Sequence, residues 1–466
     1  MVRGEFLRFS SSITGLVGAF LSVSILGACG SDGQSTKENE EPSTMDALRE
    51  LSPAVLPAPP PDVTNGYAED SSAARFGQRL FFEPRFAGRL LDGDNDGSEN
   101  ALGAEGDTGK VACAGCHLPE SGFSDTRSLH QQISLAAAWG IRRAPSLLDV
   151  GQSHLLMWDG RRDGFYNQVF GVLESEAEAN SSRLFVAYQT RALHRTEYEA
   201  IFGPMPDFSD ETRFPPLTAA ETGCSRIGSD SKCIEAKRGM PGDGAEYDSL
   251  SEADQHAVTD VVANLGKALG AYQRLLSCGQ GRFDAWVAGD ESALTESEKA
   301  GAELFVGKAR CSECHSGPFL SDEQFHNVGL KPETVATVFL DEGDEGAAKG
   351  LAAAQQDELN SKGTFSDGDD GRLPEELGSE LLGAFRTPRL RCASIRPSYM
   401  HTGHVRTLED VVAFFNRGGD PFGYPGTNEL TPLGLTPEER ADLVAFLRTL
   451  DGPGPAAELL QAPQDP

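Results

Sequence analysis

The feature that most constrains this chain is a five-residue pattern that occurs twice, as "CAGCH" at Cys113–His117 and as "CSECH" at Cys311–His315. A Cys-x-x-Cys-His segment is the attachment sequence of c-type haem: both thiols bond to the porphyrin and the histidine ligates the iron. Zinc would need four converging ligands, and a histidine directly after each cysteine pair favours haem instead. The sequence therefore predicts two covalent c-type haems. Their attachment residues are Cys113, Cys116, His117, Cys311, Cys314 and His315.

The surroundings of the two copies are also alike. "GQRLFF", which begins at Gly77, precedes the first copy, and "GAELFV", which begins at Gly301, precedes the second; "GFSD" and "FLSD" follow them. Such a duplication predicts two modules, each made of a helix, an attachment loop and a short tail. We therefore expect a mainly α fold with two cytochrome c-like domains, each binding one covalent c-type haem, and with long loops.

Several other segments carry helix signals. Apolar residues recur at helical spacing within 252–276. Thr295 and Thr436 each precede a glutamate by three residues, which predicts a capping box, and Thr407 opens a helix that stops at a glycine pair. The alternation typical of strands is scarce.

The N-terminal sequence is typical of an export signal. Arg3 and Arg8 precede an apolar segment that ends in "LGAC", so that Cys29 would become the lipidated first residue; ordinary secretory cleavage nearby is the alternative. We expect the mature chain in the periplasm, lipid-anchored through Cys29 to the membrane, which we take to be the outer membrane. The predicted organisation is a signal peptide at 1–28, a disordered tether at 29–65, an N-terminal domain at 66–285 and a C-terminal domain at 286–455.

Charge and cysteine content narrow the partners and the compartment. A net charge of −31 without a basic cluster argues against nucleic acid, and an acidic surface suits a basic redox partner. Of nine cysteines, an even number remains after the haem and lipid positions, which in an oxidising compartment indicates disulfides. Cys224 with Cys233 flanks a polar loop, which leaves Cys278 with Cys392; the sequence alone leaves both pairings open.

Longer motifs extend over most of the chain. "APSLLDVGQSHLLMWDGRRDGFYNQVFGVLESEAEAN" lies between the pentapeptides, and "FHNVGL", "AFRTPRLR", "SYMHTGHVRTLEDVVAFF" and "LTPLGLTPEERADLVAFLRTL" follow the second. In order and spacing these motifs resemble the bacterial di-haem cytochrome c peroxidase and MauG superfamily, from about residue 70 to 452. The resemblance implies a peroxidatic N-terminal haem and an electron-transferring C-terminal haem.

The resemblance also implies three catalytic residues. The family places a tryptophan between the haems, a glutamine ten residues on and a glutamate ten after that; these positions are Trp158, Gln168 and Glu178. Glu178 would then be the acid–base group that moves a proton between the oxygens of peroxide, Gln168 would orient the peroxide, and Trp158 would couple the haems electronically.

Several positions depart from the family pattern. His130 lies in the loop whose histidine, in some members, ligates the first iron before activation, but "SLHQQ" is not the usual context. Arg143 and Arg396 stand where the family binds calcium between the haems, which places calcium in doubt. The distal ligand of the second haem should be a methionine or tyrosine, but that position is Phe415. The remaining candidates are Met400, His401 and His404, or a second iron without a protein distal ligand.

Three functions follow from this reading. The first is a peroxidase that reduces hydrogen peroxide to water with electrons from a small periplasmic cytochrome c or cupredoxin. The second is a MauG-type oxidase that modifies aromatic residues of a partner protein, and the third is a di-haem electron carrier without enzymatic activity. The oligomeric state is left open, with a homodimer among the options.

Overall fold

A computed structural model describes residues 43–127, 134–217, 238–331, 344–396 and 398–464, all within one compact unit. The export signal, Cys29, His130 and the Cys224–Cys233 pair lie outside the described residues. Among the helices that are described, none combines the length and the apolar character needed to cross a membrane.

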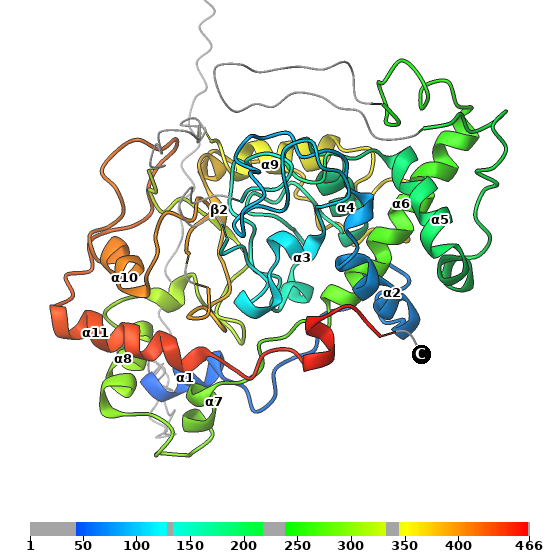
Figure 1. Ribbon diagram of the computed structural model, residues 1–466. Coiled ribbons are helices and arrows are strands. Elements are labelled where there is room, and N and C mark those ends of the chain that lie inside the picture. The colour runs from blue at the N-terminus through cyan, green and yellow to red at the C-terminus, as the bar shows by residue number, and fades with distance from the viewer. Residues whose placement is uncertain (1–42, 128–133, 218–237, 332–343, 397, 465–466) are drawn as a thin grey trace, which may run out of the picture. The chain divides into compact units, whose positions relative to one another are not determined.

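The described structure is mainly helical, as expected (Figure 1). The α-helices are α1 (Thr44–Leu51), α2 (Ser71–Phe81), α3 (Cys113–Cys116), α4 (Phe165–Leu173), α5 (Arg183–Phe202), α6 (Glu252–Gln273), α7 (Arg282–Val287), α8 (Glu296–Val306), α9 (Ala347–Gln356), α10 (Leu408–Asn416) and α11 (Pro437–Leu447). The 3-10 helices are η1 (Pro84–Phe86), η2 (Pro119–Ser121), η3 (Val150–Gln152), η4 (Cys311–Glu313), η5 (Ser379–Leu381), η6 (Arg448–Leu450) and η7 (Ala457–Leu460). Strands β1 (Phe325–His326) and β2 (Phe385–Arg386) pair antiparallel, with Phe325 opposite Arg386.

The predicted helix ends are confirmed. The hydroxyls of Thr295, Thr407 and Thr436 each accept a hydrogen bond from the backbone N–H three residues on, and α8 and α11 begin with complete capping boxes. Helix α10 ends just before Gly418 and Gly419, both with positive φ, where glycine satisfies the helix end without strain. Local sequence therefore sets where these helices start and stop.

The duplication appears as two equivalent helix pairs. Helix α2 packs against α6, and α8 packs against α11. Each crossing is so close that a Cβ atom on Gly77 would lie 1.9 Å from the carbonyl oxygen of Ala268, and one on Gly301 would lie 2.0 Å from that of Asp442. The repeated glycine is thus the residue that lets the two backbones meet in each half.

We expect Gly301→Ala to lower the free energy of unfolding by about 3 kcal/mol or more, because the added methyl group forces α8 and α11 apart. Urea unfolding followed by circular dichroism measures this loss. Gly93→Ala is the control, since its nearest neighbour would be a Glu105 side-chain oxygen at 3.7 Å. Equal losses in both variants would contradict the packing described.

The two ends of the described chain pack on the opposite halves. Leu48 and Leu51 of α1 are buried in the same apolar cluster as Phe305 and Phe446, which belong to the C-terminal half. The segment after α11 returns to the N-terminal helix pair, seen in Figure 1 as the red tail beside α2, where the Tyr272 hydroxyl donates to the Leu459 carbonyl oxygen at 2.6 Å. Each half is therefore completed by the far end of the chain.

The first of these contacts corrects a prediction. The tether expected over 29–65 is wrong for residues 44–51, which form a helix capped by Ser43 and bury Leu48 and Leu51. The composition of the whole stretch is polar and proline-rich, and this average concealed one short amphipathic helix whose two leucines pack into a core.

A disulfide joins Cys278 to Cys392, which confirms the second expected pair.

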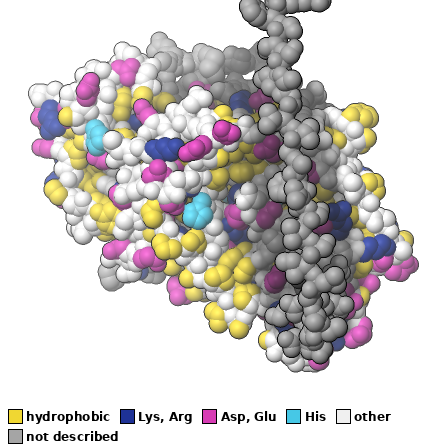
Figure 2. Space-filling view, turned by 180° about the vertical axis from the view of Figure 1, so that it is seen from behind, with side chains coloured by type: hydrophobic (Ala, Val, Ile, Leu, Met, Phe, Trp, Pro, Cys, Tyr) yellow, Lys and Arg dark blue, Asp and Glu magenta, His cyan; other side chains and the backbone are white. Residues whose placement is uncertain are grey.

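Surface charge agrees with the composition. On the face shown in Figure 2, acidic side chains are spread among basic and apolar ones, and the described residues there form no dense patch of Lys and Arg.

Candidate active site

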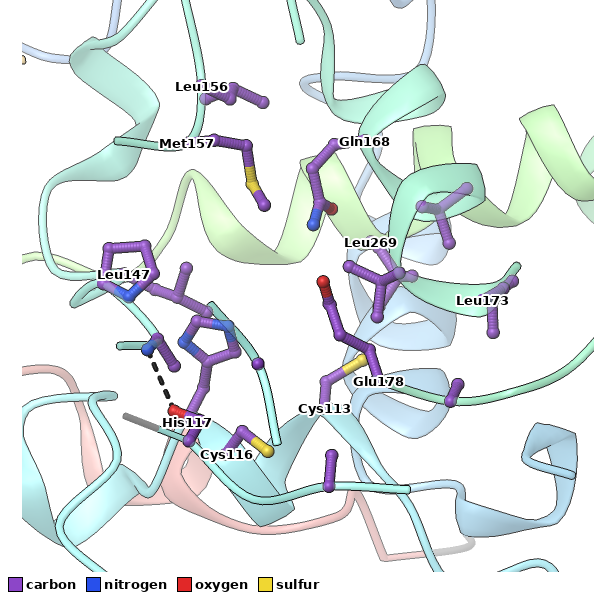
Figure 3. Close-up of a pocket in the computed structure, with 18 of the residues that line it drawn as sticks. Cys113, Cys116, His117, Leu147, Leu156, Met157, Gln168, Leu173, Glu178 and Leu269 are labelled. Atoms are coloured by element: carbon purple, nitrogen blue, oxygen red, sulfur yellow. Dashed lines mark hydrogen bonds between the residues drawn. The ribbon is translucent and has the colours of Figure 1, made fainter. Parts of the chain in front are cut away.

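The first pocket brings together residues from several separate segments. Cys113 and Cys116 lie on α3 with His117 directly after it, Gln168 lies on α4, and Glu178 lies in the turn that follows α4. Most of the remaining lining is apolar and comes from α2, α4, α6 and the loop before α4; examples are Phe81, Leu147, Leu156, Val169, Leu173, Leu265 and Leu269. The pocket is therefore an apolar chamber with a histidine and two thiols in its wall (Figure 3).

Each pentapeptide histidine is held by the same backbone contacts. The N–H of His117 donates to the Cys113 carbonyl oxygen at 2.8 Å, and that of His315 donates to the Cys311 oxygen at 2.9 Å. His117 Nδ1 lies 3.1 Å from the Phe123 carbonyl oxygen, and His315 Nδ1 lies 2.9 Å from that of Leu320. Such a bond makes Nδ1 the donor and leaves Nε2 free to bind a metal. Burial also lowers the pKa of both imidazoles, which favours the neutral, ligating form.

The thiols fit thioether attachment better than zinc. Cys113, Cys116, Cys311 and Cys314 are all free, and burial raises the pKa of Cys113 to about 11 and of Cys116 and Cys311 to about 12. Burial therefore keeps these thiols in the neutral form before any group is bound. Within the described residues, the one converging group of three metal-ligating side chains is Cys314, Asp322 and His326, so neither pentapeptide forms a metal site by itself.

A free buried donor completes the fit to haem. Arg143 lines the first pocket, is 5% exposed, and its Nη2 has no hydrogen-bond partner among the described residues. A buried guanidinium nitrogen without a partner is costly, and a carboxylate-bearing cofactor would satisfy it. Residues of both pockets therefore fit haem: Cys113, Cys116 and His117 in the first and Cys311, Cys314 and His315 in the second.

Glu178 and Gln168 face the same space as His117. Figure 3 shows the carboxylate of Glu178 and the amide of Gln168 pointing toward one another into the pocket. Burial raises the pKa of Glu178, an effect that the charges of Arg161 and Arg162 partly oppose. The Glu178 backbone is fixed by its carbonyl oxygen, which accepts from the Ala137 N–H at 2.9 Å. The structure thus brings together the two polar residues expected at the peroxide site.

Trp158 lies between the pockets. Its side chain lines both of them, and its indole N–H donates to the Arg143 carbonyl oxygen at 2.7 Å. Its ring meets that of His401 edge-on, with 6.5 Å between centroids. Trp158 is therefore a shared wall residue of the two pockets.

A second duplicated element supports both pockets. Leu156 pairs with Arg162 across one loop and Tyr399 pairs with Val405 across another, each through a backbone bond of 2.7 Å. The residue after each first partner is a methionine with positive φ, 69° for Met157 and 66° for Met400. Met157 lines the first pocket and Met400 lines the second. The shared "M-x-x-G" spacing, at residues 157–160 and 400–403, is the signal of this repeat in the sequence.

The second pocket contains two of the three ligand candidates. Met400 and His401 line it together with Phe415, whereas His404 does not; its Nδ1 lies 2.6 Å from the Thr402 hydroxyl. The His401 ring is stacked on Phe385, with 3.6 Å between centroids, and burial lowers its pKa to about 3. His401 is therefore a neutral ring already engaged in packing, and Met400 is the other candidate that lines this pocket.

Two apolar pockets, each with a thiol pair and a metal-ready histidine in its wall and both bordered by one tryptophan, fit a haem-binding redox protein. Residues 71–292 match the family described as di-haem cytochrome c peroxidase. The chain is 30% identical to the cytochrome-c peroxidase IdrP1 of Denitromonas iodatirespirans over 85% of this chain and 86% of that protein. The chain belongs to the di-haem cytochrome c peroxidase family, a family of oxidoreductases.

A second curated protein and a solved structure are also similar to this chain. The chain is 27% identical to the methylamine utilization protein MauG of Methylorubrum extorquens, over 83% of this chain and 80% of that one. The crystal structure of the di-haem peroxidase BthA from Burkholderia thailandensis aligns with a TM-score of 0.57 and 20% identity, covering 86% of this chain and 96% of that one. This structural likeness supports the fold.

Proposed function

We propose that this protein reduces hydrogen peroxide to water, using electrons from a small cytochrome c or cupredoxin and two covalently attached c-type haems. The family implies a peroxide substrate and a redox partner. The observation that carries the proposal is the pairing of Glu178, with its raised pKa, and Gln168 in the pocket of His117. The haems supply the electron chemistry, and the chain supplies a proton carrier, a hydrogen-bonding group and an apolar enclosure.

The roles of the residues follow from their chemistry. Cleaving peroxide to water requires a proton to move from one oxygen to the other, and a carboxyl group with a raised pKa both accepts and returns a proton readily near neutral pH. Gln168 would donate a hydrogen bond that orients the peroxide beside this carboxyl group. Trp158, in contact with both pockets, would couple them so that two electrons reach one peroxide molecule.

Met400 is our proposed distal ligand for the second haem. Phe415 cannot bind iron, and His401 would have to leave its stack on Phe385 to do so. A thioether ligand raises a haem potential relative to a second histidine, which suits the haem that receives electrons from a donor.

We expect Met400→Ala to abolish the near-infrared band of a methionine-ligated haem and to change the low-spin EPR signal of the second haem. Met157→Ala is the matched control, because Met157 has the equivalent place in the first loop and should leave that band intact. An unchanged band in Met400→Ala would remove Met400 as the ligand.

Phe415 also supports a second candidate function. A MauG-type oxidase would use the same pockets and Trp158 to withdraw electrons from a partner's aromatic residue, and the absence of a methionine at position 415 favours it over a standard peroxidase. A plain electron carrier has no use for the Glu178 and Gln168 pair in the first pocket. Steady-state peroxide consumption by the holo-protein with reduced cytochrome c distinguishes the peroxidase from the MauG-type oxidase and the electron carrier. No turnover under full reduction would exclude the peroxidase.

We also propose that the chain is exported and anchored to a periplasmic membrane surface through lipidated Cys29. The motif "LGAC" after an apolar segment supports this placement. Mass spectrometry of the mature N-terminus tests it, since an unmodified Cys29 or an uncleaved leader would contradict the anchor.

A further inference from the structure

Arg143 sits in the wall between the two pockets. Its backbone N–H donates to the His401 carbonyl oxygen at 2.8 Å, and its own carbonyl oxygen accepts the Trp158 indole N–H at 2.7 Å. Trp158 lines both pockets and His401 lines the second. The backbone of Arg143 is therefore fixed against Trp158, and its buried guanidinium adds a positive charge to the wall of the first pocket.

A second cation, Arg396, reinforces this charge. Arg143 Nε donates to the Asp125 carbonyl oxygen at 3.5 Å, and Arg396 lies against Gly122 of the same loop, where an added Cβ would be 3.2 Å from its Cγ. Burial, together with the charge of Arg396, lowers the pKa of Arg143 to about 9. Arg396 Nε donates to the Cys392 carbonyl oxygen at 3.1 Å and its Nη2 donates to the Arg389 oxygen at 2.9 Å. The Cys392 turn is tied in place by the disulfide to Cys278.

These contacts do not suit calcium. Calcium needs six to eight oxygen ligands and takes many of them from backbone carbonyls. Here carbonyl oxygens of the 389–392 turn accept N–H donors from Arg396, and the buried carboxylate nearest to Arg143, Asp125, pairs with Arg127 at 3.3 Å. Two fixed cations would also repel a third, since like charges in a protein interior are poorly screened.

We infer that Arg143 and Arg396 take the place of the calcium ion that the family resemblance implies between the haems, so that this chain carries its inter-haem positive charge permanently and independently of metal. A positive charge next to a haem favours the reduced, less positive state and therefore raises the reduction potential. Arg143 and Arg396 thus act as positioning and charge-setting residues, and their effect should reach both haems.

The metal test uses the holo-protein equilibrated with calcium chloride and then desalted. We expect no bound calcium by elemental analysis, and no shift of either haem potential after EGTA treatment. One tightly bound calcium per chain, or a potential that moves with EGTA, would overturn the inference. This arm needs no variant and no peroxide turnover, so it stands apart from the proposed function.

The charge test uses Arg143→Gln and Arg396→Gln, which remove the charges while keeping the backbone oxygen that holds Trp158. Spectroelectrochemical titration should show both haem potentials shifted downward in each variant. Arg195→Gln is the control, because Arg195 is an exposed residue of α5 paired with Glu199, and it should leave the potentials unchanged. Unchanged potentials in the two folded arginine variants would contradict the assigned role.

Discussion

Glu178→Gln is expected to slow peroxide turnover by about 100- to 10,000-fold, with haem content unchanged. The amide has the size of the carboxyl group and keeps its hydrogen-bonding shape, but it cannot carry a proton between the peroxide oxygens. Because burial raises the pKa of Glu178, the pH at which this group changes charge should lie above that of an ordinary glutamate. As the pH is lowered, the turnover of the wild type should therefore fall at a higher pH than an ordinary glutamate would give. This fall should disappear in the variant.

The neighbouring acid provides the control. Glu176→Gln changes a carboxyl group two residues away that does not line the pocket, and turnover should stay within a factor of two or so of wild type, as expected for a surface change. Stopped-flow peroxide consumption with haem absorbance as the loading check measures both variants. Equal loss in both would indicate a structural effect and not a lost acid–base group.

Asp284→Ala should destabilise the fold by about 3–5 kcal/mol, because it leaves a buried arginine unpaired. Arg391 is 1% exposed and its Nη1 and Nη2 donate to the two carboxylate oxygens of Asp284 at 2.8 and 2.9 Å. The same pair holds other segments: Ser52 donates to Asp284 at 2.7 Å, and Arg391 donates to the Leu51 carbonyl oxygen at 3.2 Å. Losing the pair should therefore also release α1 from the C-terminal half.

The Asp284 pair also predicts a pH dependence. Burial alone would raise the pKa of Asp284, but the hydrogen bonds and charge of Arg391 outweigh burial, and the pKa is lowered. A lowered folded-state pKa contributes stability that is present above the unfolded value, about 3.9, and is lost as the pH falls through the folded value. Wild type should thus lose stability below about pH 4 more steeply than Asp284→Ala.

Thermal or urea unfolding of the holo-protein measures this effect. Glu303→Ala, an exposed position on α8, should change stability by no more than about 0.5 kcal/mol and serves as the control. A small loss in Asp284→Ala would show that the buried pair is replaceable, and proteolysis within α1 that is no faster than in wild type would show that the pair does not hold that helix.

Much of the fold could be predicted because its signals are local. The pentapeptides and the threonine caps each act within a few residues of chain, and the structure confirms the caps. The repeated Gly77 and Gly301 marked the duplication in the sequence, but the close helix crossings they allow join segments far apart in the chain. Helix α1 escaped prediction because its stability comes from a core more than 200 residues away in sequence, where Leu48 and Leu51 meet Phe305 and Phe446. The return of the tail onto Tyr272 is equally non-local.

The site also contains some residues that could be identified from the sequence and some relations that could not. Composition and spacing alone would have left Trp158, Gln168 and Glu178 as ordinary core and helix residues, and only the family resemblance singled them out. The structure adds what no linear pattern contains: Trp158 borders both pockets, the charge of Arg396 acts on Arg143, and Met400 repeats the backbone geometry of Met157. These relations depend on segments that meet only after folding.

In our proposal, peroxide reacts in the first pocket and the second pocket delivers electrons. Single-turnover consumption of one equivalent of peroxide by fully reduced holo-protein tests it most directly, in wild type, Glu178→Gln and Met400→Ala. We expect Glu178→Gln to slow peroxide loss by at least about 100-fold while Met400→Ala retains a fast first reaction. Fast peroxide loss in Glu178→Gln together with its abolition in Met400→Ala would contradict the assignment of the two pockets.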